Sequence, residues 1–194
     1  SAVAFRYGDK QALQISAALF SGELDAADTI ENAAVSFAIT PAEWIKVGVS
    51  AITDIGEGGM ADAINEATAN GDKYDKAAGL GAFAIATHGR FSLSAEYIAA
   101  VESMRLAGQE TSSFQPSAWF LELACDIDNQ WAVAARYEGS SEFLPEEMPE
   151  TQFGLTLSFA ATEFATVSLE QLYGKFDGDN SDRHITTATL AVSF

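Results

Sequence analysis

The chain has few basic residues, and this shortage excludes one class of partner. Its 194 residues include 10 Lys and Arg against 28 Asp and Glu, so the formal net charge is −18. Binding to a phosphate backbone depends on Lys and Arg side chains that neutralise the phosphates. We therefore expect no nucleic-acid partner.

Cysteine and long apolar runs are also scarce. Cys125 is the single cysteine, so it cannot form an internal disulfide, and we interpret it as a small apolar residue. No stretch approaches the roughly 18 apolar residues that a membrane-spanning helix requires, which excludes a helical membrane protein. The sequence opens at Ser1 without a basic or apolar targeting region, so we expect any targeting segment to lie outside it.

The main pattern that is present is an alternation of apolar and polar residues with a period of two. Four segments show it most clearly, at residues 45–50, 91–97, 131–138 and 153–159. Successive side chains of a β-strand point to opposite faces, so each segment has one apolar face and one small or charged face. Almost nothing in the sequence has the period of a helix, and we predict an all-β fold.

The same analysis along the whole chain predicts about eleven strands. They are placed near residues 2–7, 11–21, 30–40, 43–55, 77–88, 90–104, 116–127, 130–141, 151–162, 164–176 and 183–194. Tight turns are predicted at residues 8–10, 41–42, 88–89, 128–129 and 162–163. They alternate with longer polar connections at residues 57–76, 107–115, 143–150 and 177–182. Short turns on one rim and long loops on the other are typical of bacterial outer-membrane barrels.

The length of the predicted strands and their odd number add to this interpretation. Most predicted strands run about 11 to 14 residues, long enough to cross a bilayer at a tilt. The last strand ends on Phe194, and such a terminal aromatic resembles the signal that the outer-membrane assembly machinery reads. Bacterial barrels have an even number of strands. We therefore predict that residues 1–194 form a single domain, an antiparallel up-and-down transmembrane β-barrel, that lacks its N-terminal strands and belongs to a larger, even-stranded barrel.

A spanning barrel turns its apolar side chains outward to lipid and its polar side chains inward to a lumen. The polar phase of the strands contains charged residues that we predict to line this lumen: Lys46, Glu96, Glu122, Arg136 and Glu170. Pairing of these charges across strands, with no role in transport, is an alternative of equal weight. Aromatic residues near strand ends fit girdles at the membrane interface: Tyr7, Trp44, Trp119, Trp131 and Tyr137.

Several stretches together resemble the LbtU-type siderophore porins, a family of bacterial outer-membrane proteins. They are residues 44–55 (WIKVGVSAITDI), 116–123 (PSAWFLEL), 135–142 (ARYEGSSE), 144–150 (LPEEMPE), 151–154 (TQFG) and 189–194 (TLAVSF). The resemblance covers essentially the whole chain and depends on the order and spacing of these pieces. It implies a C-terminal part of a larger barrel and siderophore uptake that is independent of TonB. An acidic lumen and acidic loops would oppose a polycarboxylate cargo.

Other motifs are weaker. Asp177, Asp179 and Asp182 could supply oxygen ligands to Ca²⁺, but their spacing lacks the Gly and the distal Glu of an EF-hand. A solvated turn is therefore the main interpretation. No metal or cofactor is predicted. His88 and His184 are interpreted as turn and rim residues. Residues 60–70 could form a short helix that folds into the mouth, or else a mobile acidic loop.

No catalytic motif is present, so no enzyme is predicted, although hydrolases built on outer-membrane barrels exist.

Three functions remain open at this stage. The leading one is a porin-like channel for a small solute in the bacterial outer membrane, with membrane lipid and the assembly machinery as partners and a homo-oligomer as an option. The second is a structural or scaffold barrel whose lumen is plugged or encloses a partner protein. The third is a soluble β-sandwich, which requires the apolar face of each strand to pack against a second layer.

Overall fold

A computed structural model describes residues 1–9, 12–22, 30–58, 64, 75–105, 113–142, 149–176 and 182–193. Within these ranges the chain forms one antiparallel sheet in which every strand pairs with its neighbours in sequence, in the order β1 to β11. The strands are β1 (Ala2–Gly8), β2 (Leu13–Phe20), β3 (Asn32–Ala42), β4 (Ile45–Ile52), β5 (Gly79–His88), β6 (Phe91–Ala100), β7 (Ser117–Asp126), β8 (Trp131–Ser141), β9 (Thr151–Thr162), β10 (Ala165–Lys175) and β11 (Arg183–Val192). The all-β, up-and-down arrangement and the eleven strands predicted from the sequence are confirmed.

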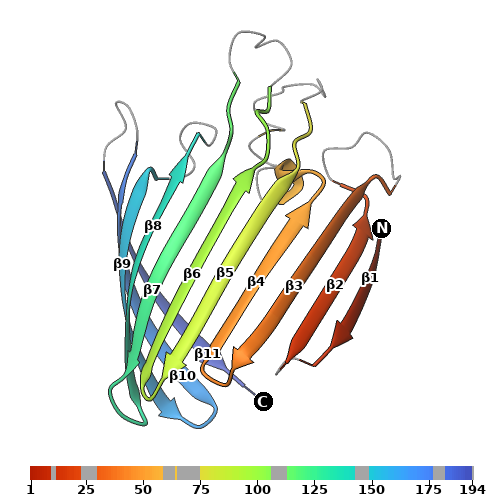
Figure 1. The fold of residues 1–194 in the computed structure, drawn as a ribbon. Coiled ribbons are helices and arrows are strands. Elements are labelled where there is room, and N and C mark those ends of the chain that lie inside the picture. The colour runs from red at the N-terminus through yellow and green to blue at the C-terminus, as the bar shows by residue number, and fades with distance from the viewer. Residues whose placement is uncertain are drawn as a thin grey trace.

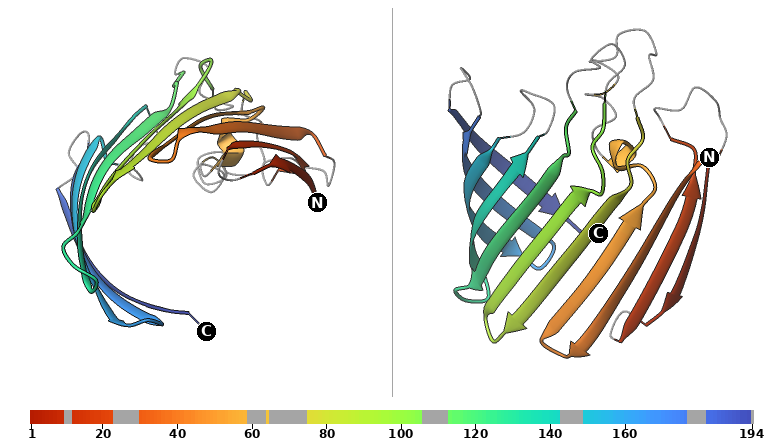
Figure 2. Two further views of the ribbon diagram at one scale, coloured as in Figure 1. Left: turned by 60° about the horizontal axis from the view of Figure 1, so that its bottom comes forward. Right: turned by 45° about the horizontal axis from the view of Figure 1, so that its top comes forward.

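The sheet is a single curved layer. Figure 2 shows that the strands follow one another around an open arc, with β1 and β11 as its two edges. Strands β1, β3, β5, β7 and β9 end at one rim, where the connections are short, and β2, β4, β6, β8 and β10 end at the opposite rim, where the longer connections begin (Figure 1). The described residues contain no helix that is long and apolar enough to cross a membrane.

Local chemistry explains several of the tight turns. The Asp128 carboxylate accepts hydrogen bonds from the backbone N–H groups of Gln130 and Trp131, both at 2.8 Å, which closes the turn between β7 and β8. Gly89 has a φ of +59°, which a residue without a Cβ adopts at little cost, and it begins the two-residue turn between β5 and β6.

The predicted turn at residues 41–42 was wrong by two residues. β3 continues through Pro41 to Ala42, and the turn consists of Glu43 and Trp44. The pairing of β3 with β4 shifts between Ile39 and Ala42, because proline has no N–H to offer the ladder and is tolerated in a strand mainly at such irregularities.

The strands have 7 to 12 residues each, and eight of the eleven are shorter than predicted; β1 is one residue longer, and β3 and β9 have the predicted length. β4 ends at Ile52 because the buried carboxylate of Asp54 accepts the N–H of Gly56 at 3.0 Å and so begins the 3₁₀ turn η1 (Ile55–Gly58). β6 ends at Ala100, and beyond it Met104 pairs with Phe114, which precedes β7, only through an isolated bridge. In both places a change of backbone direction at the rim ends the regular pairing.

One face of the sheet carries most of the large apolar side chains, and these are exposed. Thirty large apolar or aromatic residues in the described ranges are exposed, against six hydrophobic residues that are buried. Val3 and Leu190, on the two outermost strands, are both 65% exposed. No second layer covers these side chains within the described part of the chain. The β-sandwich alternative, which requires such a layer, is therefore not supported.

Candidate functional site: the concave wall

The inner face of the arc is identified by the segment that packs on it. Ile52 of β4 and Ile98 of β6 pack against the buried cluster that contains Ile55 of η1, and a Cβ on Gly79 would be 3.0 Å from Ile55. Figure 2 shows η1 on the inside of the curve. Ile52 and Ile98 therefore point to the concave side, and the register of the sheet assigns every other strand residue to one of the two faces.

Nearly all charged residues of the strands lie on this concave face. The register places there the five residues that the sequence analysis selected, which are Lys46, Glu96, Glu122, Arg136 and Glu170. It adds four that the analysis did not select, which are Arg6, Asp126, Glu138 and Arg183. Lys175 is the exception, and it is the last residue of β10. The wall thus has four positive and five negative side chains.

Arg136 on β8 is the centre of an ion-pair cluster on the wall. Its Nη2 and Nε atoms both lie 3.0 Å from Oε2 of Glu122, its direct partner on β7. Its Nη1 atom lies 3.8 Å from Oε2 of Glu138, two residues along the same strand. Gln152 on β9 donates a hydrogen bond to the carboxylate of Glu138. Cross-strand pairing, the alternative raised from the sequence, therefore applies to Glu122 and Arg136.

The other three selected residues make no ion pair within the described ranges. The Nζ atom of Lys46 lies 5.9 Å from the centre of the Phe83 ring, which occupies the space left by Gly48. Glu96 is exposed and lies between Phe83 and Phe120 in the register. Glu170, on β10, is part of the same face but distant from the cluster in strand order. Their side chains are therefore available to the interior of the arc.

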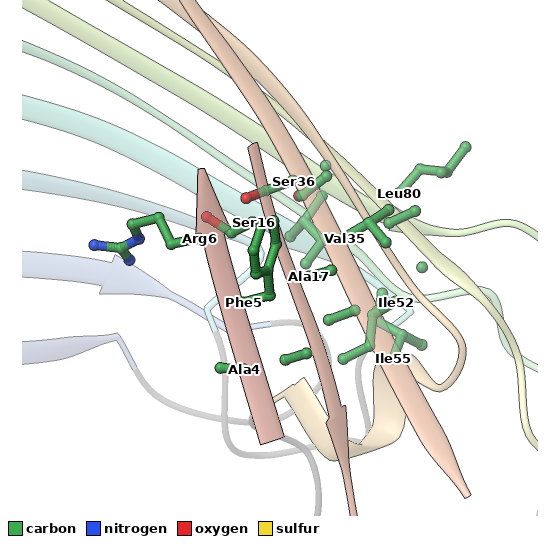
Figure 3. A pocket seen from close by; sticks show the side chains of 17 residues that line it. Ala4, Phe5, Arg6, Ser16, Ala17, Val35, Ser36, Ile52, Ile55 and Leu80 are labelled. Atoms are coloured by element: carbon green, nitrogen blue, oxygen red, sulfur yellow. The ribbon is translucent and has the colours of Figure 1, made fainter. Parts of the chain in front are cut away.

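A hollow of about 520 Å³ lies on this face of β1 to β5. A row of polar side chains crosses it, because Arg6 and the serines Ser16, Ser36 and Ser50 are direct partners in successive strands. Figure 3 shows the Arg6 side chain extending away from the sheet, on the side opposite to Leu80. Ile52 and Ile55 line the same hollow. This row was not predicted from the sequence, although Arg6 stands between Phe5 and Tyr7 and thus in the polar phase of its strand.

The connection between β4 and β5 turns inward at its beginning. Ile55, Ile64 and Ala77 of this connection are buried together with Ala100 and Met104. The expected helix at residues 60–70 lies outside the described residues except for Ile64, which is 1% exposed. Part of the apolar concave wall near the long-connection rim is therefore covered by the chain itself.

The convex face carries two rows of aromatic residues. On β6, β8 and β9 they are six residues apart, as in Phe91 and Tyr97, Trp131 and Tyr137, and Phe153 and Phe159. Six residues correspond to about 20 Å along a strand. Neighbouring rings touch within a row, since the centroids of Trp131 and Phe159 are 4.6 Å apart. The two rows occupy the places where an amphipathic ring fits the two interfaces of a bilayer.

The weaker candidates are not brought into one site. Asp177 and Asp179 lie outside the described residues, and Asp182 accepts a hydrogen bond from Tyr173 at 2.5 Å. His184 packs on the Tyr173 ring, and His88 pairs with Phe91 beside the turn. In the described ranges no group of three or more His, Cys, Asp or Glu side chains is arranged to hold a metal ion. Phe194, the predicted assembly signal, also lies outside them.

Comparisons with known proteins agree with this geometry. No protein-family model and no curated protein matches the chain. Two outer membrane proteins are among the solved structures of similar fold. The outer membrane channel DcaP of Acinetobacter baumannii has a TM-score of 0.61 and 10% identity, over 97% of this chain and 60% of that one. OmpT, an outer membrane protein of Vibrio cholerae solved in a trimer form, has a TM-score of 0.59 and 15% identity, over 97% of this chain and 59% of that one.

These identities are too low to carry more than the fold, and the chain spans about three fifths of the length of the two structures. The fold agrees with the predicted location in the bacterial outer membrane. Neither comparison distinguishes the LbtU-type family from other outer-membrane channels. The chain has the fold of an outer-membrane β-barrel channel.

Proposed function

We propose that the chain forms part of the wall of a water-filled channel through which a small solute diffuses without covalent chemistry. One observation carries the proposal. The same strands place nine of their ten charged residues on the concave face and an apolar, aromatic surface on the convex face. In hydrocarbon this arrangement is stable only with lipid outside and water or protein inside. The similarity to an outer membrane channel supports it further.

Most of the net charge of the sequence falls in the five longer connections between strands. The five longer connections contain 19 acidic and 3 basic residues, which gives −16 of the total of −18. The concave wall, with five acidic and four basic residues, is close to neutral. We therefore infer that the excess negative charge forms an acidic rim, at the ends of the strands from which the longer connections leave, more than an acidic lumen. A rim of one sign raises the local concentration of counter-ions and repels ions of its own sign. We therefore expect a preference for cations.

Current recordings on the full-length protein in planar bilayers test this proposal. Discrete single-channel currents are expected, and the reversal potential in a KCl gradient should indicate a preference for K⁺. The preference should weaken at about 1 M salt, where the screening length is about 3 Å. Absence of current would favour the scaffold alternative, in which the lumen is filled, and an anion preference at low salt would contradict the assigned role of the rim.

Uptake of ferric siderophores is a more specific form of the same proposal. It is supported by the resemblance of residues 44–55, 116–123 and 135–142 to the LbtU-type siderophore porins. The acidic rim makes a cationic or neutral siderophore a better candidate than a polycarboxylate one. Swelling of protein-containing liposomes in each type of ferric siderophore would compare them directly.

A homo-oligomer also belongs to the proposal. It is supported by the trimer form of Vibrio cholerae OmpT, which shares the fold. The convex face would then supply both the lipid contact and the contact between copies.

A further inference from the structure

A second hollow, of about 300 Å³, lies on the concave wall over β6, β7 and β8. Its apolar lining includes Ile98, Ala118, Phe120 and Pro149. Ile98 also lines the hollow over β1 to β5, so the two hollows adjoin. A volume near 300 Å³ is at the lower end of the range for small-molecule sites.

Two carboxylates stand on either side of this apolar floor. Glu96, Phe120 and Glu138 are direct partners in three successive strands, so the Phe120 ring lies between the two acidic residues. Strands are about 4.8 Å apart, which puts the backbones of Glu96 and Glu138 about 10 Å from each other. Both residues line the hollow. A ligand of about this width could contact both of them.

Negative charge is in excess around the hollow, because the nearby carboxylates outnumber the nearby basic side chains. Arg136 is shared between Glu122 at 3.0 Å and Glu138 at 3.8 Å, and its guanidinium carbon lies 5.8 Å from the Phe120 ring centre. Glu96 has no ion pair or hydrogen-bond partner in the described ranges. Lys46, the next cation along the wall, is over Phe83 and does not line the hollow. Three carboxylates thus face one bound guanidinium.

We propose that this hollow is a binding subsite for an organic cation with an apolar or aromatic body. The carboxylate of Glu96 would hold the ammonium or guanidinium group, Glu138 would add a second negative charge, and the free part of the Phe120 ring would contact the body of the solute. An aromatic face attracts a cation that is close to it, and partial exclusion of water strengthens that attraction. The inference rests on the proposed channel function and deepens it, because it names the class of solute that binds to the channel wall.

Binding of benzyltrimethylammonium to the full-length protein in non-ionic detergent tests the subsite by titration calorimetry. We expect saturable binding, and about tenfold weaker binding in Glu96→Gln, since one charged contact is removed. Glu170→Gln is the matched control, because it neutralises another concave carboxylate away from the hollow, and it should bind like the unmodified protein. Benzenesulfonate, an anion with the same ring, should not bind. Far-UV circular dichroism confirms that each variant is folded.

The same probe in bilayer recordings separates this inference from the channel function. Currents that benzyltrimethylammonium does not reduce, together with no saturable binding, would overturn the subsite and leave the channel intact. Equal binding to the unmodified protein and to Glu96→Gln would also overturn it. Glu96-dependent binding without any current would retain the subsite and contradict the channel.

Discussion

Arg136 shows how a charged residue becomes part of the wall rather than a free charge in the lumen. Its guanidinium contacts Glu122 on the neighbouring strand with two nitrogen atoms, and it approaches Glu138 with a third. The side chain is 42% exposed, so solvent screens the pair and reduces its contribution. The cluster therefore contributes little to the stability of the fold, and its main effect is on the orientation of the Glu138 side chain.

Replacement of Arg136 by Gln should lower the free energy of unfolding by about 1 kcal/mol, because Glu122 and Glu138 then repel each other without a cation between them. Urea unfolding in lipid vesicles, followed by tryptophan fluorescence, measures this change. Lys46→Gln is the control, because Lys46 has no ion pair in the described part of the chain, and its effect should remain within about 0.5 kcal/mol. Equal losses in both variants would contradict the assigned role of the cluster.

The face of each charged residue could be predicted from the sequence, but its partner could not. A period of two assigns Lys46 and Arg136 to the polar phase without any knowledge of the neighbouring strands. The contact between Arg136 and Glu122 depends on the register of β7 and β8, which the Asp128 turn sets. Glu138 stands in the same polar phase, but its neighbours Gln152 and Phe120 are brought beside it only by the register of β7, β8 and β9, which the sequence does not show.

β9 is suited to a comparison of the two faces of the sheet, because it contains no charged residue of its own. Leu155 points to the convex face and is 52% exposed, and Thr156 points to the concave face in the same row as Glu170. Water hydrates a charge on the concave face, whereas lipid cannot hydrate a charge on the convex face. Two adjacent residues of one strand should therefore respond in opposite ways to the same substitution.

Leu155→Arg should destabilise the protein in lipid vesicles by about 2 to 4 kcal/mol, the cost of an arginine on the lipid face of a barrel near the midplane. Thr156→Arg, its neighbour, should change the stability by less than about 1 kcal/mol, because the guanidinium enters water. Both values are obtained from urea unfolding in the same vesicles. Similar losses in the two variants would mean that the convex face does not contact lipid.

The positions of the strands were predictable because each strand has its own alternation and turn signals, whereas the ends of the strands were not. Asp54 ends β4 through a side-chain hydrogen bond that competes with the ladder, and Val101 follows a strand end that no turn residue marks. The sequence predicts a turn at Pro41, whereas the structure places this residue within β3 at a register shift. Alternation specifies the middle of a strand, and local competition for hydrogen bonds specifies its ends.

At the scale of the whole molecule, the open arc is the feature that requires completion. β1 and β11 both run from the long-connection rim to the short-turn rim, so they would be parallel if they were paired with each other. All ten pairings in the sheet are antiparallel, and an odd number of strands cannot close in that way. Each unpaired N–H or C=O group on these two edges would cost several kcal/mol in hydrocarbon.

We therefore propose that an odd number of further strands, not among these eleven, completes an even-stranded barrel. The structures of similar fold support it, since the chain spans only about three fifths of them. Hydrogen–deuterium exchange of the full-length protein in vesicles measures the outcome. Peptides that cover β1 and β11 should exchange as slowly as those of β6, which has a partner on both sides, and the turn at Gly89 and Arg90 serves as the exposed reference. Fast exchange of β1 and β11 beside a protected β6 would mean that the edges stay open, and a sheet with open edges in lipid would contradict both the barrel and the channel function that depends on it.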